Sequence, residues 1–339
     1  MLGIKIPLGI AEKIKREIIE KDALDNNYKY IKEKEYIIFP LKKQIKVEGA
    51  EISEFDFVKN NKPKDMKEIL KDELSEEEFE KLKTAHDTIG NIAILEIDED
   101  LRDKEEIIAK ALLESNKQIK TVLRKDGCHE GDFRVQKMKF LAGLDTRETV
   151  TVENRVRLKL NVETVYYSPR LSTERKRIYE QIKPGETILV MFSGCAPFPC
   201  VISKNTEAKE IIGIEINPAG HDYGVENLKI NKLDNVVLIN DDVKDIVPLF
   251  VDRNVRFDRI VMPAPHNAND FLGEAMSIAK KSTIVHFYDF QHEDNFKEVE
   301  GKAEKAAEEA GFKYKKIDLV KAGQHAPHVF RVCLDFVVN

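Results

Sequence analysis

The feature that most constrains the fold of this chain is a regular alternation of apolar and helical segments that begins near Pro169. Each apolar segment is short and continuous, as in strands that are buried on both faces of a sheet. The expected strands are 187–192, 211–216, 236–240, 257–262 and 283–288. Helices are expected between them, for example at 223–231 and 270–281. This alternation predicts a mostly parallel, Rossmann-type sheet, which an antiparallel pair at 312–318 and 329–338 completes.

Two smaller units are predicted before this Rossmann-type domain, which we place at residues 166–339. Residues 1–58 have helically spaced apolar residues at 10–21 and a strand-like run at 36–41, which indicates a small α/β module. The stretch 59–68 is the expected linker, because no large apolar residue occurs between Lys59 and Asp65.

Residues 69–165 are predicted to form an α+β middle domain. Ser75 and Glu78 have the spacing of a capping box, which predicts a helix through Leu82, and a further helix is expected at 105–115. The expected strands are 92–97, 121–123, 137–141, 150–152 and 157–162. The predicted fold class is therefore α/β, with a Rossmann-type domain preceded by a small α/β module and an α+β middle domain.

The charge balance leaves a nucleic-acid partner open. The 339 residues include 55 Lys and Arg and 61 Asp and Glu, which gives a formal net charge of −6. Nucleic-acid binding depends on a local basic face rather than on the total charge. No apolar run approaches the roughly 20 residues that a membrane-spanning helix needs, so no membrane partner is expected.

Cysteine and histidine usage favours a cytoplasmic protein without a metal. The four cysteines, at 128, 195, 200 and 333, form no CxxC pair, so reduced thiols are expected rather than disulfides or zinc ligands. The histidines at 286, 292, 325 and 328 lack the tight spacing of a metal site. Packing or surface roles are expected for them.

Three features lie at the expected strand ends, where sheets of this kind bind ligands. The turn after the first strand contains Gly194, which lets the backbone approach a ligand, but a dinucleotide fingerprint would have three glycines, so NAD binding is disfavoured. Glu215 ends the second strand and can accept both hydroxyls of a ribose. Asp242 follows the third strand and can meet an adenine amine. Each feature alone is weak, but the three in this order favour a cofactor that contains ribose and adenine.

Several motifs resemble the archaeal and eukaryotic tRNA (guanine-37) N1-methyltransferase family. They are the segments 167–175, 185–186 and 191–198, together with 89–97 and 131–134 upstream. The segments 286–290 and 327–333 are similar to the archaeal branch that also acts on wyosine intermediates. The resemblance runs from about residue 85 to the end, and the first 60 residues match only in size and general pattern.

The resemblance implies S-adenosylmethionine as the cofactor and tRNA as the partner of a monomeric enzyme. The N-terminal module would touch the outer corner of the tRNA, and the middle and catalytic domains would hold the anticodon loop. Motif matching implies that Arg134 is the catalytic arginine and Glu174 the general base. The implied cofactor-binding residues are Arg175, Phe192, Gly194, Glu215, Ile216, Asp242, Val243 and Pro263, and the implied substrate-binding residues are Tyr166, Arg170 and Pro265.

The chemistry of guanine is compatible with these two catalytic roles. Guanine N1 carries a proton, which a carboxylate can take as the methyl group arrives. Negative charge then grows on O6, where a guanidinium would stabilise it. The target base must leave its stack, which a loop permits at low cost. Without the resemblance, Glu174 would be read as a helix-dipole partner and Arg134 as part of a phosphate-binding or solvated surface.

Two departures from the family keep alternatives open. Val190 stands where most members have Asp, and Ala196 where a second Gly is usual. The segment 262–266, Met-Pro-Ala-Pro-His, replaces the Asn-Pro-Pro-Tyr or Asn-Leu-Pro of related enzymes, which argues against methylation of an exocyclic amine and weakens strict N1 specificity.

The first alternative is C7 methylation of a tricyclic wyosine precursor, 4-demethylwyosine, alone or as a second activity. The second is aminocarboxypropyl transfer from the same cofactor, although such relatives tend to have a Gly-Tyr-Val-His-type loop after the fourth strand. The third is a tRNA-binding module without catalysis.

Overall fold

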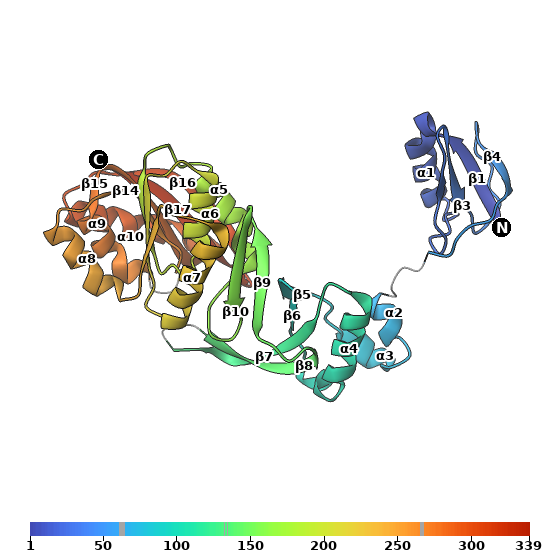
Figure 1. The fold of residues 1–339 in the computed structure, drawn as a ribbon, viewed down its shortest axis with the longest axis horizontal. Helices are drawn as coiled ribbons and strands as arrows, with labels where there is room; N and C mark the ends of the chain where they lie inside the picture. The colour runs from blue at the N-terminus through green and yellow to red at the C-terminus, as the bar shows by residue number, and fades with distance from the viewer. Residues whose placement is uncertain (61–64, 132, 134, 265–267) are drawn as a thin grey trace. The chain divides into compact units, whose positions relative to one another are not determined.

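The computed structural model describes residues 1–60, 65–131, 133, 135–264 and 268–339 (Figure 1). It divides into two compact units, Met1–Ile69 and Leu70–Asn339. The first unit contains the predicted α/β module. Its antiparallel sheet has the order β2-β3-β1-β4 and is built from β1 (Leu2–Pro7), β2 (Ile31–Lys32), β3 (Tyr36–Pro40) and β4 (Glu51–Glu54). The helix α1 (Ala11–Glu20) follows the short turn η1 (Leu8–Ile10) and buries Ile14 and Ile18 in the core that includes Ile4 and Ile6 of β1.

The expected linker is shorter in the structure than in the prediction. Lys59 forms a bridge with Tyr28, and the backbone N–H of Asn60 donates to Asn27, so both residues pair with the first unit. The helix α2 (Met66–Leu70) occupies the other end of the predicted stretch. Residues 61–64 lie outside the described residues.

The middle region contains a four-stranded sheet with the order β5-β6-β7-β8. The strands are β5 (His86–Ile89), β6 (Ile92–Leu95), β7 (Thr121–Glu130) and β8 (Val135–Gly143), and β6 and β7 are parallel. Helix α4 (Glu105–Ser115) agrees with its prediction and contacts β7 and β8. Helix α3 (Glu76–Lys81) begins with the predicted capping box, since Ser75 and Glu78 exchange side-chain and backbone hydrogen bonds.

The hairpin of β9 (Glu148–Glu153) and β10 (Val156–Asn161) was predicted with the middle domain but packs on the Rossmann-type domain. Asparagine side chains of α7 (Pro218–Asn231) pair with the free edge of β10. Asn231 accepts from the N–H of Arg157 (2.8 Å) and donates to its carbonyl (2.7 Å), and Asn227 does the same for Lys159 (2.7 and 3.0 Å). The two side-chain amides thus hydrogen-bond backbone groups of β10 that would otherwise need a neighbouring strand.

Replacing Asn231 by Ala is expected to lower the free energy of unfolding by about 2–4 kcal/mol. The reason is that two backbone groups of β10 lose their partners, and each unpaired buried polar group costs about 1–3 kcal/mol. Chemical denaturation measures this loss. The matched control is Lys229→Ala, on the exposed side of the same helix, which should change stability by less than about 0.5 kcal/mol. Equal effects of the two variants would contradict the edge-pairing role.

The Rossmann-type sheet has seven strands in the order β13-β12-β11-β14-β15-β17-β16. The first five along the chain are parallel: β11 (Thr187–Met191), β12 (Glu210–Ile214), β13 (Val236–Ile239), β14 (Phe257–Met262) and β15 (Ala279–His292). The strands β16 (Tyr314–Ala326) and β17 (Val329–Val338) form the predicted antiparallel hairpin, and β17 inserts beside β15. The predicted fold class is confirmed.

Helices cover both faces of this sheet (Figure 1). One face is packed by α8 (Val243–Asp252), α9 (Leu272–Ser277) and α10 (Phe296–Glu309). The other is packed by α5 (Ser172–Tyr179), which the turn η3 (Pro169–Leu171) precedes, and by α6 (Pro197–Asn205) and α7. None of the helices among the described residues is both long enough and apolar enough to cross a membrane.

The helix predicted at 270–281 is wrong in its second half. A short turn, η4 (Ala268–Phe271), leads into α9, which ends at Ser277, and β15 starts at Ala279. The hydroxyl of Thr283 accepts from the N–H of Lys280 (2.9 Å) and donates to the carbonyl of Phe257 (2.6 Å). This tertiary bond to β14 holds residues 279–283 in the sheet, which helical periodicity cannot reveal.

Candidate active site

The strand order of the sheet reverses beside β11, because the chain moves outward through β12 and β13 and then returns to place β14 on the other side of β11. In doubly wound sheets the ligand site lies at the carboxyl ends of the strands beside such a reversal. Except for Arg175, the predicted cofactor residues follow β11, β12, β13 and β14 at this edge. The topology therefore places the strand-end residues at one edge of the sheet.

The loop after β11 has an unusual backbone. Phe192, Gly194 and Ala196 all have positive φ angles, of 57°, 56° and 62°. Non-glycine residues in this region cost on the order of 1–3 kcal/mol each and persist only where the surroundings impose them. Close packing of α7 is one such constraint, since a Cβ on Gly224 would lie 2.8 Å from Leu238 and 3.3 Å from Ala196. The loop is therefore held in one shape.

Glu215 stands directly after β12, and its carboxylate ties two loops. One oxygen accepts from the N–H of Gly194 (2.6 Å) and the other from the N–H of Asn217 (2.8 Å). Burial raises the pKa of the Glu215 carboxyl above its ordinary value, although the two backbone donors act in the opposite direction. Each carboxylate oxygen keeps a further lone pair. The group can therefore accept two more donors, such as the hydroxyls of a ribose.

The other strand-end residues line the same edge. The apolar side chain of Ile216 is 42% exposed there. Asp242 caps α8, where its side chain accepts from the N–H of Lys244 (2.8 Å), and Val243 is buried. Asn240 was missed by the sequence analysis: its amide donates to the carbonyls of Glu215 (2.7 Å) and Ile216 (3.3 Å), which fixes the β12 end. Pro263, after β14, is half-buried.

Arg175 is placed differently from the strand-end residues. Its guanidinium forms a bidentate pair with Glu153 of β9 (2.5 Å to each oxygen) and also donates to the carbonyl of Ser168 (3.1 Å). Arg175 is 1% exposed and lies over the rings of Tyr167 and Phe198. The side chain joins α5 to the β9–β10 hairpin, and a cofactor contact for it stays a prediction.

Glu174 lies on the inner side of α5, 6% exposed, in a buried polar network. Its Oε1 accepts from the hydroxyl of Tyr288 (2.7 Å) and from Arg177 (2.7 Å), and its Oε2 accepts from Arg177 Nε (2.9 Å). Arg177 also pairs with Asp335 of β17 (2.5 Å). Oε1 is therefore saturated, whereas Oε2 keeps one lone pair for a proton.

The network continues to a cluster of His286, Cys333 and Asp335, whose possible ligand atoms lie within 4.8 Å of one another. His286 Nε2 contacts Arg259 (2.6 Å) and Nδ1 contacts Asp335 (2.6 Å). An arginine only donates, so Nε2 accepts and Nδ1 carries the proton. Burial lowers the pKa of His286, which keeps this histidine neutral. A cation here would face the guanidiniums of Arg177 and Arg259, so the cluster is better explained as packing between α5 and the sheet.

The predicted substrate residues lie beside a cavity of about 470 Å³. Tyr166 and Arg170 both line it, and Arg170 pairs with Asp87 of β5 (2.9 Å). Residues of the middle sheet and of the strands β15, β16 and β17 also line this cavity. The predicted residues Arg134 and Pro265 lie outside the described residues.

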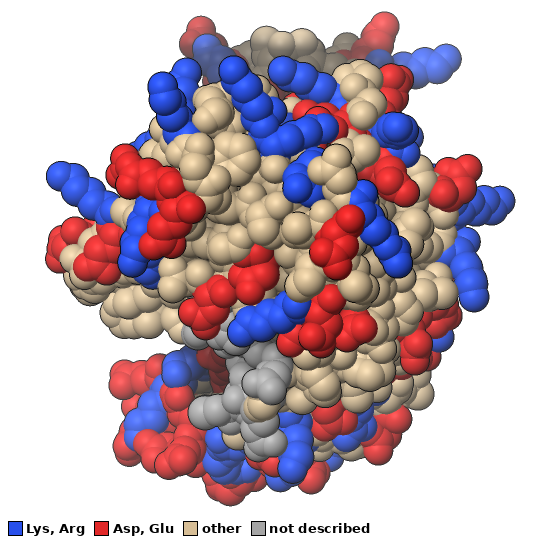
Figure 2. All heavy atoms as spheres, turned by 90° about the vertical axis from the view of Figure 1, so that its left-hand side faces the viewer, with Lys and Arg blue, Asp and Glu red and all other residues tan. Residues whose placement is uncertain are grey.

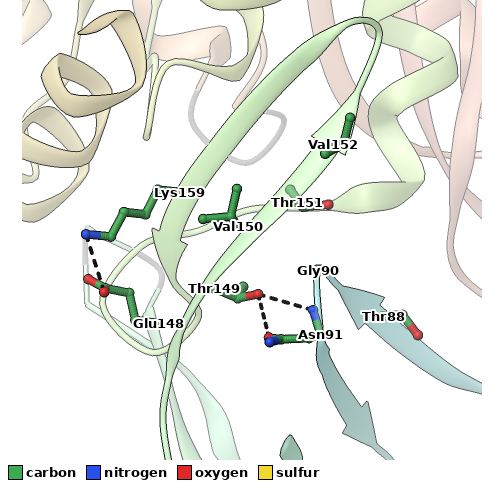
Figure 3. A pocket seen from close by; sticks show the side chains of 9 residues that line it. All are labelled: Thr88, Gly90, Asn91, Glu148, Thr149, Val150, Thr151, Val152 and Lys159. Carbon is green, nitrogen blue, oxygen red and sulfur yellow. Dashed lines mark hydrogen bonds and ion pairs between the residues drawn. The ribbon is translucent and has the colours of Figure 1, made fainter. Parts of the chain in front are cut away.

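A second hollow, of about 670 Å³, lies beside β9 and the β5–β6 turn (Figure 3). The Thr149 hydroxyl accepts from the N–H of Asn91 (3.2 Å), which ties the strand to the turn. Lys159 pairs with Glu148 (3.4 Å) in the same view. Because these charges neutralise each other, the hollow is a weaker candidate for an anionic substrate than the cavity beside Tyr166.

The surface charge adds little to the location of the site. On the face that Figure 2 shows, Lys and Arg lie beside Asp and Glu around a largely uncharged centre. Neighbouring charges of opposite sign cancel beyond a Debye length of about 8–10 Å. This face therefore presents no single-sign field to a polyanion.

These features describe a Rossmann-type domain whose candidate cofactor residues lie at its switch point, with a cavity lined by this domain and the middle sheet. Three family models match the chain: the TRM5/TYW2 methyltransferase domain at residues 149–315, the TYW2 N-terminal domain at 66–146, and the tRNA methyltransferase 5 N-terminal domain at 3–50. The chain belongs to the TRM5/TYW2 family of methyltransferases.

Similar curated proteins include tRNA (guanine(37)-N(1))-methyltransferase Trm5b of Pyrococcus abyssi, which is 34% identical over 100% of this chain and 99% of that protein. The tRNA (guanine(37)-N(1))/4-demethylwyosine(37)-methyltransferase Taw22 of Nanoarchaeum equitans is 32% identical over 64% of this chain and 86% of that protein. The tRNA(Phe) (4-demethylwyosine(37)-C(7)) aminocarboxypropyltransferase of Pyrococcus horikoshii is 33% identical over 80% and 96%.

Solved structures extend this likeness to the fold. Trm5b of P. abyssi has a TM-score of 0.78 over 100% of this chain and 99% of that chain, at 34% identity. A complex of aTrm5 with tRNALeu has a TM-score of 0.75 at 27% identity, with 100% of both chains covered. P. horikoshii TYW2 in complex with MeSAdo has a TM-score of 0.68 at 30% identity, over 80% of this chain and 97% of that chain.

Proposed function

We propose that this chain transfers the methyl group of S-adenosylmethionine to N1 of guanosine 37 in tRNA. The observation that carries the proposal is the match of the whole chain, in sequence and in fold, to a tRNA (guanine(37)-N(1))-methyltransferase of P. abyssi. The complex of a similar protein with tRNALeu supports tRNA as the substrate. The complex of another with MeSAdo, together with Glu215 at the end of β12, supports the adenosine-containing cofactor.

In this proposal the carboxyl-end edge of the sheet holds the cofactor. Glu215 accepts the ribose hydroxyls with its two remaining lone pairs, while Ile216 and Asp242 border the adenine. Phe192, Gly194 and Pro263 border the rest of the cofactor, with Val243 packed behind. S-adenosylmethionine supplies an electrophilic methyl group, so the protein must supply only position and proton transfer.

The substrate side uses the cavity beside Tyr166. Glu174 takes the N1 proton, Arg134 stabilises the charge on O6, and Tyr166, Arg170 and Pro265 contact the nucleotide. The N-terminal module binds the outer corner of the tRNA. We also propose that the protein is a cytoplasmic monomer. Size-exclusion chromatography with light scattering would test the monomeric state.

The test of the proposal is mass spectrometry of position 37 after incubation of the purified protein with S-adenosylmethionine and an unmodified tRNA transcript. The expected product is guanosine with one added methyl group at N1. If the transcript remains unmodified, the proposal is overturned.

A second candidate function is C7 methylation of 4-demethylwyosine at the same position. It is favoured by the likeness to Taw22 of N. equitans and by the TYW2 N-terminal model over residues 66–146. Two incubations of the protein with precursor-bearing tRNA distinguish methyl transfer from aminocarboxypropyl transfer. In one the cofactor carries a label in its methyl group, and in the other it carries a label in its aminocarboxypropyl group. Methyl label supports the second candidate, and aminocarboxypropyl label supports the activity named for the P. horikoshii relative.

Replacing Glu215 by Gln is expected to weaken S-adenosylmethionine binding by about 10–100-fold. The amide group of glutamine loses one acceptor oxygen, and a hydrogen bond to a charged group is worth about 1.5–3 kcal/mol. Isothermal titration calorimetry measures the change. Glu210→Gln, at the exposed start of β12, is the matched control. Equal affinity in the two variants would remove Glu215 from the cofactor site.

A further inference from the structure

The cavity beside Tyr166 contains an arginine that the sequence analysis did not select. Arg331 lies on β17 and lines this cavity together with residues of the middle sheet such as Gln136 and Met138. The cavity volume of about 470 Å³ falls in the range of small-ligand pockets, roughly 300–1,000 Å³. One unstacked nucleotide is a ligand of this size class.

The guanidinium of Arg331 is only partly used within the protein. Its Nη2 donates to the hydroxyl of Tyr166 (2.9 Å). Its Nε is buried and has no hydrogen-bond partner among the described residues. A buried donor without a partner is unfavourable, and natural proteins contain few of them. The guanidinium of Arg331 therefore keeps a donor that no acceptor among the described residues satisfies.

The charges around Arg331 also favour a ligand with an acceptor oxygen. The carboxylates that line the cavity, Asp87 and Glu96, are already paired with Arg170 (2.9 Å) and Lys125 (2.6 Å). Arg331 forms no ion pair within the described part of the chain. The cavity thus keeps a positive charge that favours an acceptor oxygen of a ligand.

An aromatic surface lies next to this charge. The rings of Phe290 and His325 are stacked, with centroids 4.1 Å apart and planes at 28°. The guanidinium of Arg331 lies 5.2 Å from the Phe290 ring centroid. Proteins that bind unstacked bases use aromatic rings and arginine planes together with hydrogen-bond donors. Both elements occur here on the three adjacent strands β15, β17 and β16.

We propose that Arg331, held by Tyr166, binds an acceptor oxygen of the target nucleotide, and that Phe290 and His325 form the surface against which this nucleotide rests. The inference deepens the proposed function, on which it rests, by naming a substrate-binding residue in the C-terminal hairpin. The acceptor is a base carbonyl or a backbone phosphate, which share the chemistry that a guanidinium recognises.

The test compares Arg331→Met and Arg331→Lys with wild type in two measurements on the full chain. These are the Kd for an unmodified tRNA transcript and the single-turnover rate of methyl transfer. Arg331→Met is expected to weaken binding or slow transfer by about 10–100-fold, and Arg331→Lys by less, because lysine keeps the charge but not the fork of donors. The matched control is Lys321→Met, which removes a cation over Phe330 in the same hairpin and should behave as wild type.

Two modified tRNAs distinguish the sources of the acceptor. A neutral methylphosphonate on either side of nucleotide 37 should abolish the difference in Kd between wild type and Arg331→Met if the acceptor is a phosphate. A 2-aminopurine at position 37, which lacks the carbonyl, should abolish it if the acceptor is the base.

The outcomes separate the inference from the proposed function. Wild-type Kd and rate in both Arg331 variants would overturn the inference and leave the proposed function intact. A wild-type protein that binds tRNA without transferring methyl would overturn the proposed function, while the Kd of the variants would still test Arg331. If Arg331→Met does not fold, Arg331→Lys and Phe290→Leu take its place, with the same expected direction.

Discussion

Replacing Glu174 by Gln is expected to slow single-turnover methyl transfer by roughly 10²–10⁴-fold, the contribution typical of a general base. Glutamine keeps the shape of the side chain and an acceptor oxygen for Tyr288, but it cannot take the proton from guanine N1. Cofactor affinity should stay within about 3-fold of wild type, because the strand-end residues that we assign to the cofactor lie on other elements. Rapid-quench assays with saturating enzyme measure the chemical step.

The surroundings of Glu174 demand a strict control, because its carboxylate also anchors α5 to β15 and β17 through Tyr288, Arg177 and Asp335. Tyr288→Phe removes one hydrogen bond of this network and leaves the carboxylate in place. We expect it to slow transfer by less than about 10-fold, since a typical hydrogen bond contributes about 0.5–1.5 kcal/mol. If the two variants lose the same transfer rate and the same thermal stability, the role of Glu174 is structural and not proton transfer.

Replacing Arg175 by Ala is expected to lower the free energy of unfolding by about 3–5 kcal/mol. The change leaves the Glu153 carboxylate buried without its counter-charge, and breaking a buried pair from one side is strongly destabilising. Chemical denaturation of the variant measures the loss. Lys176→Ala, beside it on α5, removes only an exposed pair with Glu180 (3.7 Å) and should cost less than about 1 kcal/mol.

A double variant separates the two roles that Arg175 can have. Arg175→Met combined with Glu153→Gln removes both charges and keeps an acceptor for the hydroxyl of Tyr167, so we expect it to recover at least half of the lost stability. A wild-type Kd for S-adenosylmethionine in this variant would limit Arg175 to joining α5 and the hairpin. A large rise in Kd at recovered stability would support the cofactor contact that the family resemblance implies.

The strand-end half of the candidate site could be predicted from the sequence because its signals are local. Continuous apolar runs mark buried strands, and the carboxyl ends of parallel strands meet at one edge. Gly194, Glu215 and Asp242 therefore needed only their positions after each run to be placed together. The capping box of Ser75 and Glu78 is similarly local, and the structure confirms it.

The substrate side could not be predicted in the same way, because its contacts join distant parts of the chain. Arg331 meets Tyr166 across 165 positions, and Arg177 meets Asp335 across 158. A single sequence has no periodicity or spacing that reports such pairs. The family resemblance selected Tyr166 and Glu174, but it could not show that Glu174 would be held by Tyr288 or that Arg331 would retain an unused donor.

Apolar periodicity and strand-end position are properties of short segments, so they were enough to predict the class of the fold, the segments that form the parallel strands and the residues at their carboxyl ends. The order of the strands in the sheet and the other features of the site depend on tertiary contacts. The tertiary structure ended the helix at Ser277, moved the β9–β10 hairpin onto α7 through asparagine side chains, buried Arg175 against Glu153 and formed the cavity around Arg331. Each of these depends on which polar groups meet when distant segments pack, because a buried polar group must find its partner wherever the fold brings one.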